Sequence, residues 1–152
     1  MKIIYHYGLY LICLIMGLST PAHSQAQSPY AWKYRPVYIF APAETAAELT
    51  EQIDLFMQQT VEMADRNMAL IAVTDRAEVI FGPEQPYKSA ELRRVYNIAP
   101  AEFTVILVGK DTGVKRRHIG VIDPNIIFTQ IDGMPMRRQE MRQQELQVKE
   151  TQ

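Results

Sequence analysis

Cationic side chains are the strongest candidates for chemistry in this 152-residue chain. Arginine forks and lysine ammonium groups bind carboxylate, sulfate or phosphate oxygens through charge-assisted hydrogen bonds. Five such groups together predict an anion-binding site: Arg35, Lys110, Lys115, Arg117 and Arg137. The competing interpretation of Lys115 to His118 is an exposed hairpin edge, where charge prevents edge-to-edge pairing.

The residues around Pro135 also have a structural interpretation. Proline has no N–H to donate to the preceding turn, so a helix through this segment must kink or restart there. Met134 and Met136 would pack in the core, because methionine at helical spacing is usually a core residue. Arg137 and Glu140, three residues apart, would pair and hold the kinked helix to the sheet.

Other site chemistry has less support. Ser-His-Asp catalysis would need His118 as base and an orienting carboxylate from Asp111, Asp123 or Asp132, but no nucleophile motif accompanies them. Paired-carboxylate chemistry would need Asp111 and Asp132 side by side. Zinc lacks ligands, copper would find one histidine, and no phosphate-binding glycine loop is present. We therefore expect no metal and no cofactor.

The first 24 residues have the features of a secretory signal. Lys2 supplies a weakly positive start, residues 9–16 form an apolar core, and Ala22 to Ser24 offer small residues for cleavage after Ser24 or Ala26. The apolar core is well short of the roughly 20 residues of a membrane-spanning helix. The sequence therefore predicts a periplasmic or secreted protein, with no membrane insertion once the signal is removed.

The domain boundaries follow from this signal. We expect a signal peptide at 1–24, a polar leader at 25–29, one domain at 30–142 and a polar tail at 143–152. A formal net charge of −1 is too balanced to imply nucleic acid as a partner, and the oligomeric state stays open. The expected partner is an envelope or extracellular ligand with an anionic group.

Cys13 is the only cysteine, and it lies in the predicted signal. The mature chain would then carry no thiol. Disulfide exchange and peroxide attack both need a thiolate, so we expect neither thiol-disulfide oxidoreductase nor peroxiredoxin chemistry. The remaining enzymatic alternative is a non-cysteine site, in an enzyme or antioxidant factor, around Lys110, Asp111, Asp132 and Arg137.

Hydrophobic patterning predicts the elements that position these residues. Apolar, β-branched runs predict buried strands at 35–41, 68–73 and 103–108. Helical spacing predicts one long helix from Thr45, its inner stripe including Met57 and Val61, and a second helix from Ser89 with Val95 on its inner face. A short extra strand is expected at 79–81 and a hairpin return at 114–118. Asp123 followed by proline is a good start for the last helix.

Strand, helix, strand, helix, strand, strand, helix is the order of a minimal thioredoxin fold. We therefore expect an α/β, thioredoxin-like domain with a central mixed sheet of about four strands flanked by helices. In thioredoxins, the loop after the first strand carries the cysteine pair. Here that loop reads Ala41-Pro42-Ala43-Glu44, so the active-site cysteine pair is lacking.

Two stretches, 109–115 and 131–141, resemble the signature of a mostly bacterial family called domain of unknown function 4174. The residues that carry the resemblance are Lys110, Asp111, Gly113, Lys115, Asp132, Met134, Pro135, Met136, Arg137 and Glu140. Residues 32–36 and Asp65-Arg66 also fit the family, whereas Asn67 departs from its acidic pattern. The family is similar to a module in secreted equarin and sushi-repeat proteins, and the resemblance implies a thioredoxin-like fold without an established activity.

Overall fold

The computed structural model describes residues 28–42 and 46–151. The predicted signal, most of the polar leader and residues 43–45 of the loop after the first strand lie outside the described residues, so these predictions stay open. The described elements are β1 (Arg35–Phe40), α1 (Ala46–Met57), α2 (Thr60–Asp65), β2 (Met68–Val73), β3 (Ala77–Phe81), α3 (Ser89–Tyr96), β4 (Thr104–Val108), β5 (Val114–Ile119), α4 (Pro124–Asp132) and α5 (Pro135–Glu150).

One mixed sheet runs through the molecule, with strand order β3-β2-β1-β4-β5. β1 and β2 are parallel, with Arg35 beside Met68 and Phe40 beside Val73. β4 is antiparallel to β1, and β5 returns beside β4 as the predicted hairpin. The extra strand expected at 79–81 is present as β3, paired antiparallel to β2, and brings the sheet to five strands.

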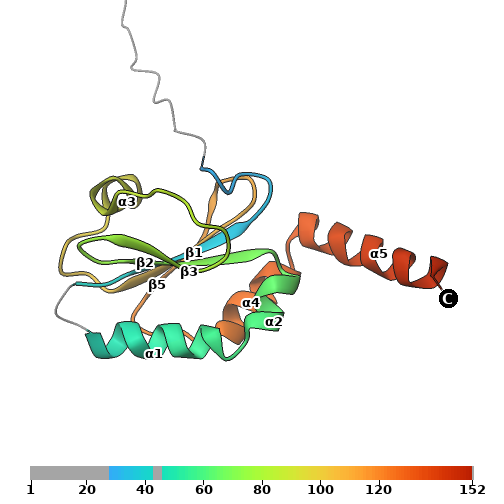
Figure 1. Ribbon diagram of the computed structural model, residues 1–152, viewed down its shortest axis with the longest axis horizontal. Coiled ribbons are helices and arrows are strands. Elements are labelled where there is room, and N and C mark those ends of the chain that lie inside the picture. Colours follow the sequence, from blue (N-terminus) through green and yellow to red (C-terminus); the bar gives the residue numbers. More distant parts are fainter. Residues whose placement is uncertain (1–27, 43–45, 152) are drawn as a thin grey trace, which may run out of the picture.

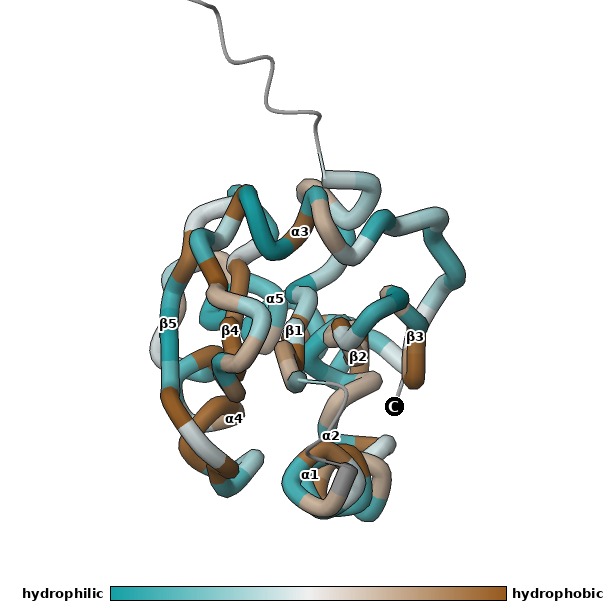
Figure 2. Tube along the Cα trace, turned by 90° about the vertical axis from the view of Figure 1, so that its left-hand side faces the viewer, coloured by the Kyte–Doolittle hydropathy of each residue, from teal (hydrophilic) through white to brown (hydrophobic). Residues whose placement is uncertain are grey.

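The two faces of the sheet are covered by different helices (Figure 1). Side chains alternate along β1, so Val37 and Ile39 face α1, α2 and α4, where they pack with Phe56, Met63 and Phe128. Tyr38 and Phe40 face the α3 side and join an apolar cluster with Leu92, Ile98 and other residues. Figure 2 shows this layering end-on, with α3 on one side of the strands and α1 and α4 on the other.

The predicted long first helix is wrong, because it is two helices. Gln59 leaves the helical conformation (φ −126°, ψ 39°), and α2 starts at the next residue. This interruption resets the helical phase, so Met63 is buried while Val61 is 79% exposed. Met57, the last residue of α1, is also exposed. Both residues were expected on the inner stripe.

Side-chain hydrogen bonds fix the ends of two other helices. The Asp123 carboxylate accepts from the Asn125 N–H at 2.8 Å, which confirms the predicted start of α4. Ser89 does not cap α3 as expected, because its hydroxyl donates to the Thr74 carbonyl and so ties α3 to the end of β2. Val95, also expected on the inner face, is exposed.

The last helix restarts at Pro135. Residues before proline are pushed toward extended conformations, and Met134 has ψ 142°, which separates α4 from α5. The end of α5 reaches away from the rest of the molecule (Figure 1), and residues 142–151 are exposed. Within the part of the chain that the structure describes, no helix has the length and apolarity to span a membrane.

Candidate functional site

Charged residues gather at the amino ends of β1 and β2, which is also the carboxyl end of β4. Four cations meet three carboxylates there: Arg35, Arg66, Lys110 and Arg137 with Asp65, Asp132 and Glu140. We call this group the ionic cluster. Arg35, Lys110 and Arg137 are among the buried residues of the protein, at 1%, 9% and 2% exposure. Such burial is unusual for charged groups and requires that they be paired.

Sheet register brings these residues together from distant parts of the chain. Arg35 is the first residue of β1, and its partner across the sheet, Met68, directly follows Asn67. β4 runs in the opposite direction to β1, so Lys110, two residues after the end of β4, lies at the same end of the sheet as Arg35. The junction of α4 and α5 then places Asp132, Arg137 and Glu140 at this end of the sheet.

The Glu140 carboxylate is the central acceptor. Arg35 donates to both oxygens, from Nη1 to Oε2 at 3.1 Å and from Nη2 to Oε1 at 3.0 Å. Lys110 Nζ donates to Oε1 at 2.8 Å. Burial alone would raise the pKa of Glu140, but the hydrogen bonds and charges of Arg35 and Lys110 outweigh burial and lower this pKa.

Lys110 lies where the backbone is least relaxed. Of the four non-glycine residues with positive φ in the described chain, three surround it: Trp32, Asn67 and Thr112. Trp32 donates its N–H to the Lys110 carbonyl at 2.7 Å, and Asn67 Oδ1 accepts from Lys110 Nζ at 2.8 Å. Positive φ is costly for side chains as bulky as tryptophan and tends to occur at functional sites.

The second half of the ionic cluster centres on Asp132. Its carboxylate accepts from Arg66 Nη2 at 2.7 Å and from Arg137 Nε at 3.3 Å. Arg137 also donates to both the carboxylate and the carbonyl of Asp65, so it does not pair with Glu140 as the sequence suggested. Burial disfavours the charge of Arg66, but hydrogen bonds to Asp132 and Glu62 prevail and raise its pKa.

Three of the five cations predicted to bind an anion belong to the ionic cluster: Arg35, Lys110 and Arg137. The other two lie elsewhere. Lys115 pairs with Asp111 at 2.6 Å on the exposed turn. Arg117 donates to the Tyr96 carbonyl and lies 3.9 Å from Glu102. The anion site itself stays a prediction.

The motif residues between these cations have mainly local roles. Gly113 leaves room for the Lys115 side chain, since a Cβ at position 113 would lie 3.3 Å from Lys115 Nζ. Pro135 starts α5, and Met134 packs against the core. Met136 is exposed, contrary to the expectation that both methionines are buried, because the restart of the helix turns its side chain outward.

Catalytic arrangements weighed from the sequence find no added support. Asp111 pairs with Lys115 and Asp132 pairs with two arginines, so the carboxylates serve separate ion pairs. His118 lies on β5 as the register partner of Val105 in the β4–β5 ladder. Within residues 28–42 and 46–151, no three histidine, cysteine, aspartate or glutamate side chains lie close enough together to hold a metal ion.

Arg93, which sequence reasoning missed, fills the opposite end of the sheet. Its guanidinium donates to the carbonyls of Ala41 and Val73, which follow and end β1 and β2, at 2.7 and 3.2 Å. It also donates to the Ala99 carbonyl at 3.0 Å and lies over the Phe40 ring. Burial lowers the pKa of Arg93. No sequence signal marks Arg93, because all its acceptors are backbone carbonyls.

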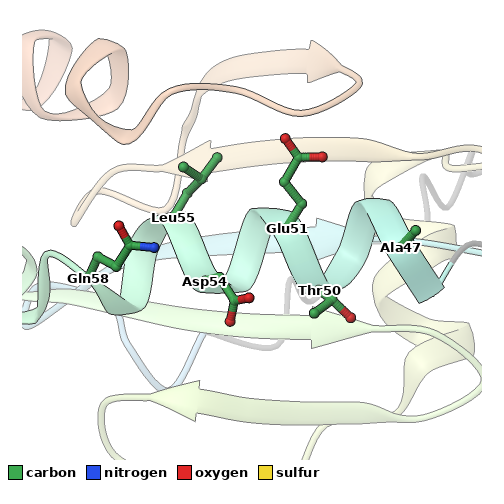
Figure 3. Close-up of a pocket in the computed structure, with 6 residues that line it drawn as sticks. All are labelled: Ala47, Thr50, Glu51, Asp54, Leu55 and Gln58. Atoms are coloured by element: carbon green, nitrogen blue, oxygen red, sulfur yellow. The ribbon is translucent and has the colours of Figure 1, made fainter.

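Two shallow hollows are separate from the ionic cluster. The larger, about 600 Å³, lies along the outer side of α1 and is lined by Ala47, Thr50, Glu51, Asp54, Leu55 and Gln58 (Figure 3). The smaller lies on the last turns of α5. Neither contains a member of the ionic cluster.

Fold and site together define a thioredoxin-like α/β domain without a cysteine pair, since the chain has one cysteine. Thioredoxin peroxidase I of Plasmodium yoelii superposes with a TM-score of 0.53 at 15% identity, covering 72% of this chain and 78% of that one. StoA of Bacillus subtilis has a TM-score of 0.42 at 13% identity, with 64% and 82% covered. At such identities the first likeness shows the fold alone.

The family model described as Domain of unknown function (DUF4174) matches residues 28–140. The chain therefore belongs to this family, as the motif residues predicted. The matched range includes the whole ionic cluster and ends at Glu140, its central carboxylate.

Proposed function

We propose that this protein is an exported, thioredoxin-like binding module of the cell envelope that works without thiol chemistry and recognises an anionic group at the ionic cluster. The proposal of export rests on the predicted signal at 1–24. The proposal that no thiol chemistry occurs rests on removal of this signal, which contains Cys13. The ligand remains defined by its chemistry alone, as a carboxylate, sulfate or phosphate.

One observation carries the anion proposal: Arg35 and Lys110, both buried, converge on a single carboxylate. The bidentate contact from Arg35 is the geometry by which arginine recognises planar anions. With Glu62, which pairs with Arg66 at 2.6 Å, four carboxylates match the four cations. The cations are the more buried partners, at 1–12% side-chain exposure against 23–53% for the carboxylates. The buried part of the cluster is therefore cationic and needs negative partners.

Titration of the protein with glutarate and inorganic phosphate at low salt tests this function. Trp32, the only tryptophan of the chain, is joined to Lys110 by a backbone hydrogen bond, so its fluorescence reports on the site. We expect binding that weakens about tenfold or more in Lys110→Met, because a hydrogen bond to a charged group contributes roughly 1.5–3 kcal/mol. Exposed Lys88→Met is the matched control. Absence of binding to the unaltered protein, or equal binding by Lys110→Met, would overturn the proposal.

An enzyme or antioxidant factor using Lys110, Asp111, Asp132 and Arg137 is the alternative class. Asp132→Asn separates the two, because an acid–base site loses its role when this carboxyl is neutralised. A binding module keeps anion affinity in a folded Asp132→Asn variant. Since both aspartates already serve as ion-pair partners, the binding module is the better-supported function.

A further inference from the structure

We propose that Glu140 is a built-in ligand: α5 places its own carboxylate in the anion site, and an external carboxylate must displace it. This inference rests on the proposed function and adds the class of ligand and the way in which access is controlled.

The groups that hold Glu140 all come from outside α5. Arg35 starts β1, Asn67 precedes β2 and Lys110 follows β4, so the three residues come from separate segments at one end of the sheet. We call Arg35, Asn67 and Lys110 the cradle. Lys110 is bridged to Asn67 and to Glu140 at the same distance, 2.8 Å. With Glu140 withdrawn, two buried cations would point their donors at one place. Uncompensated buried charges are costly, so the cradle would attract another anion.

The helix that carries Glu140 is attached at one end only. Its described side-chain hydrogen bonds with the body are those of Arg137 and Glu140, and a 3.5 Å bond from Gln144 to Asp65. Residues 142–151 are exposed, and α5 leads away from the other elements (Figure 1). The break at Met134 separates α5 from α4, so α5 can leave without unfolding α4.

The cradle selects carboxylates among anions because a carboxylate is what it holds now. Arg35 donates to both oxygens of Glu140, and Lys110 adds a second donor to one of them. Trp32, 65% exposed, and Lys33, also exposed, lie on the segment bonded to Lys110. An acidic peptide can therefore place its carboxylate in the cradle while its neighbouring residues contact these two side chains. A free dicarboxylate offers the same group without those contacts.

Glu140→Gln tests the inference, because it removes the competing charge while nearly keeping the shape. Exposed Glu145→Gln, on the same helix, is the matched control. Glutarate and a hexapeptide of glutamates are titrated, with Trp32 fluorescence as the readout. We expect Glu140→Gln to bind both probes at least tenfold more tightly than the unaltered protein, and Glu145→Gln to match it. Tighter binding of the hexapeptide than of glutarate identifies a peptide as the source.

Equal affinities of Glu140→Gln and the unaltered protein would overturn the inference while leaving anion binding in place. Binding by neither would overturn the proposed function as well. Hydrogen exchange of the unaltered protein avoids dependence on a variant that fails to fold. Bound hexapeptide should accelerate amide exchange in α5 several-fold and leave α1 unchanged. Unchanged or slower exchange in α5 with the hexapeptide bound would contradict displacement.

Discussion

At the scale of single residues, Lys110 shows how strain and charge are combined. An ammonium group this deeply buried must be held by acceptors, and Asn67 supplies one of them. Asn67 can do so because it adopts φ +48°, a conformation that asparagine tolerates better than most residues. The departure from the acidic family pattern at this position therefore has a structural role.

Replacing Asn67 separates its two contributions. Asn67→Gly loses the hydrogen bond to Lys110 but accepts the positive φ, whereas Asn67→Ala loses the bond and is strained as well. We expect Asn67→Ala to unfold with a free energy about 1 kcal/mol lower than Asn67→Gly, because left-handed backbone is unfavourable for alanine. Urea denaturation measures both. A glycine variant less stable than the alanine variant would contradict this assignment.

The sequence predicted which cations matter better than it predicted their partners. Arg35, Lys110 and Arg137 do meet at one end of the sheet. Local spacing suggested that Arg137 pairs with Glu140, whereas Glu140 pairs with Arg35 and Arg137 pairs with Asp132. These partners depend on the register of the strands and on the direction of α5, which local spacing does not give. Arg93 could not be recognised because its acceptors are backbone carbonyls, which every sequence supplies.

At the scale of elements, breaks between helices determine where charged groups point. The break at Pro135 was predictable, because proline and its restriction on the preceding residue act locally. The break between α1 and α2 was not, since neither Gln58 nor Gln59 is a helix-breaking residue type. Strands were predicted well because their apolar runs are short, buried and bounded by turn residues.

Pro135→Ala tests the role of the second break. In a continuous helix, residues five apart point to nearly opposite sides, so Asp132 and Arg137 could not pair as they do. We expect Pro135→Ala to lower the free energy of unfolding by about 0.5–1 kcal/mol, as proline no longer restricts the unfolded chain. Exposed Pro86→Ala is the control for changing a proline outside this junction. A rise in stability on urea denaturation of Pro135→Ala would show that the break is not favoured.

At the scale of the whole molecule, the two ends of the sheet have different chemistry. Thioredoxins place their cysteines in the loop after the first strand, whereas here Arg93 closes that end by binding three carbonyls. The ionic cluster occupies the other end. Between them, a group of tyrosines fills the α3 face, with Tyr38 in ring contact with both Tyr87 and Tyr96.

This aromatic face predicts alkaline instability. Burial raises the pKa of Tyr30 and of Tyr87 from 10.0 to about 12. A raised folded-state pKa means that the stabilisation is complete below pH 10 and is lost as the pH rises toward 12, because the unfolded chain ionises first. The tyrosinate absorbance of Tyr87, taken as the difference between the unaltered protein and Tyr87→Phe, should therefore appear together with loss of tertiary circular dichroism. Tyr87→Phe, with one ionisable group fewer, should lose less stability over this range. A difference absorbance that develops near pH 10 without unfolding would contradict the burial of the Tyr87 hydroxyl.

The two edge strands of the sheet are protected unequally. β5 carries Lys115, Arg116 and Arg117, and the Lys115 carbonyl accepts a hydrogen bond from Gln130 of α4. β3 has one charged residue, Glu78, among apolar side chains. Charge on an edge strand keeps other chains from adding to the sheet. We therefore expect any association of folded copies in concentrated solution to involve the β3 edge more than the β5 edge. Salt should narrow this difference between the two edges by screening the cations of β5.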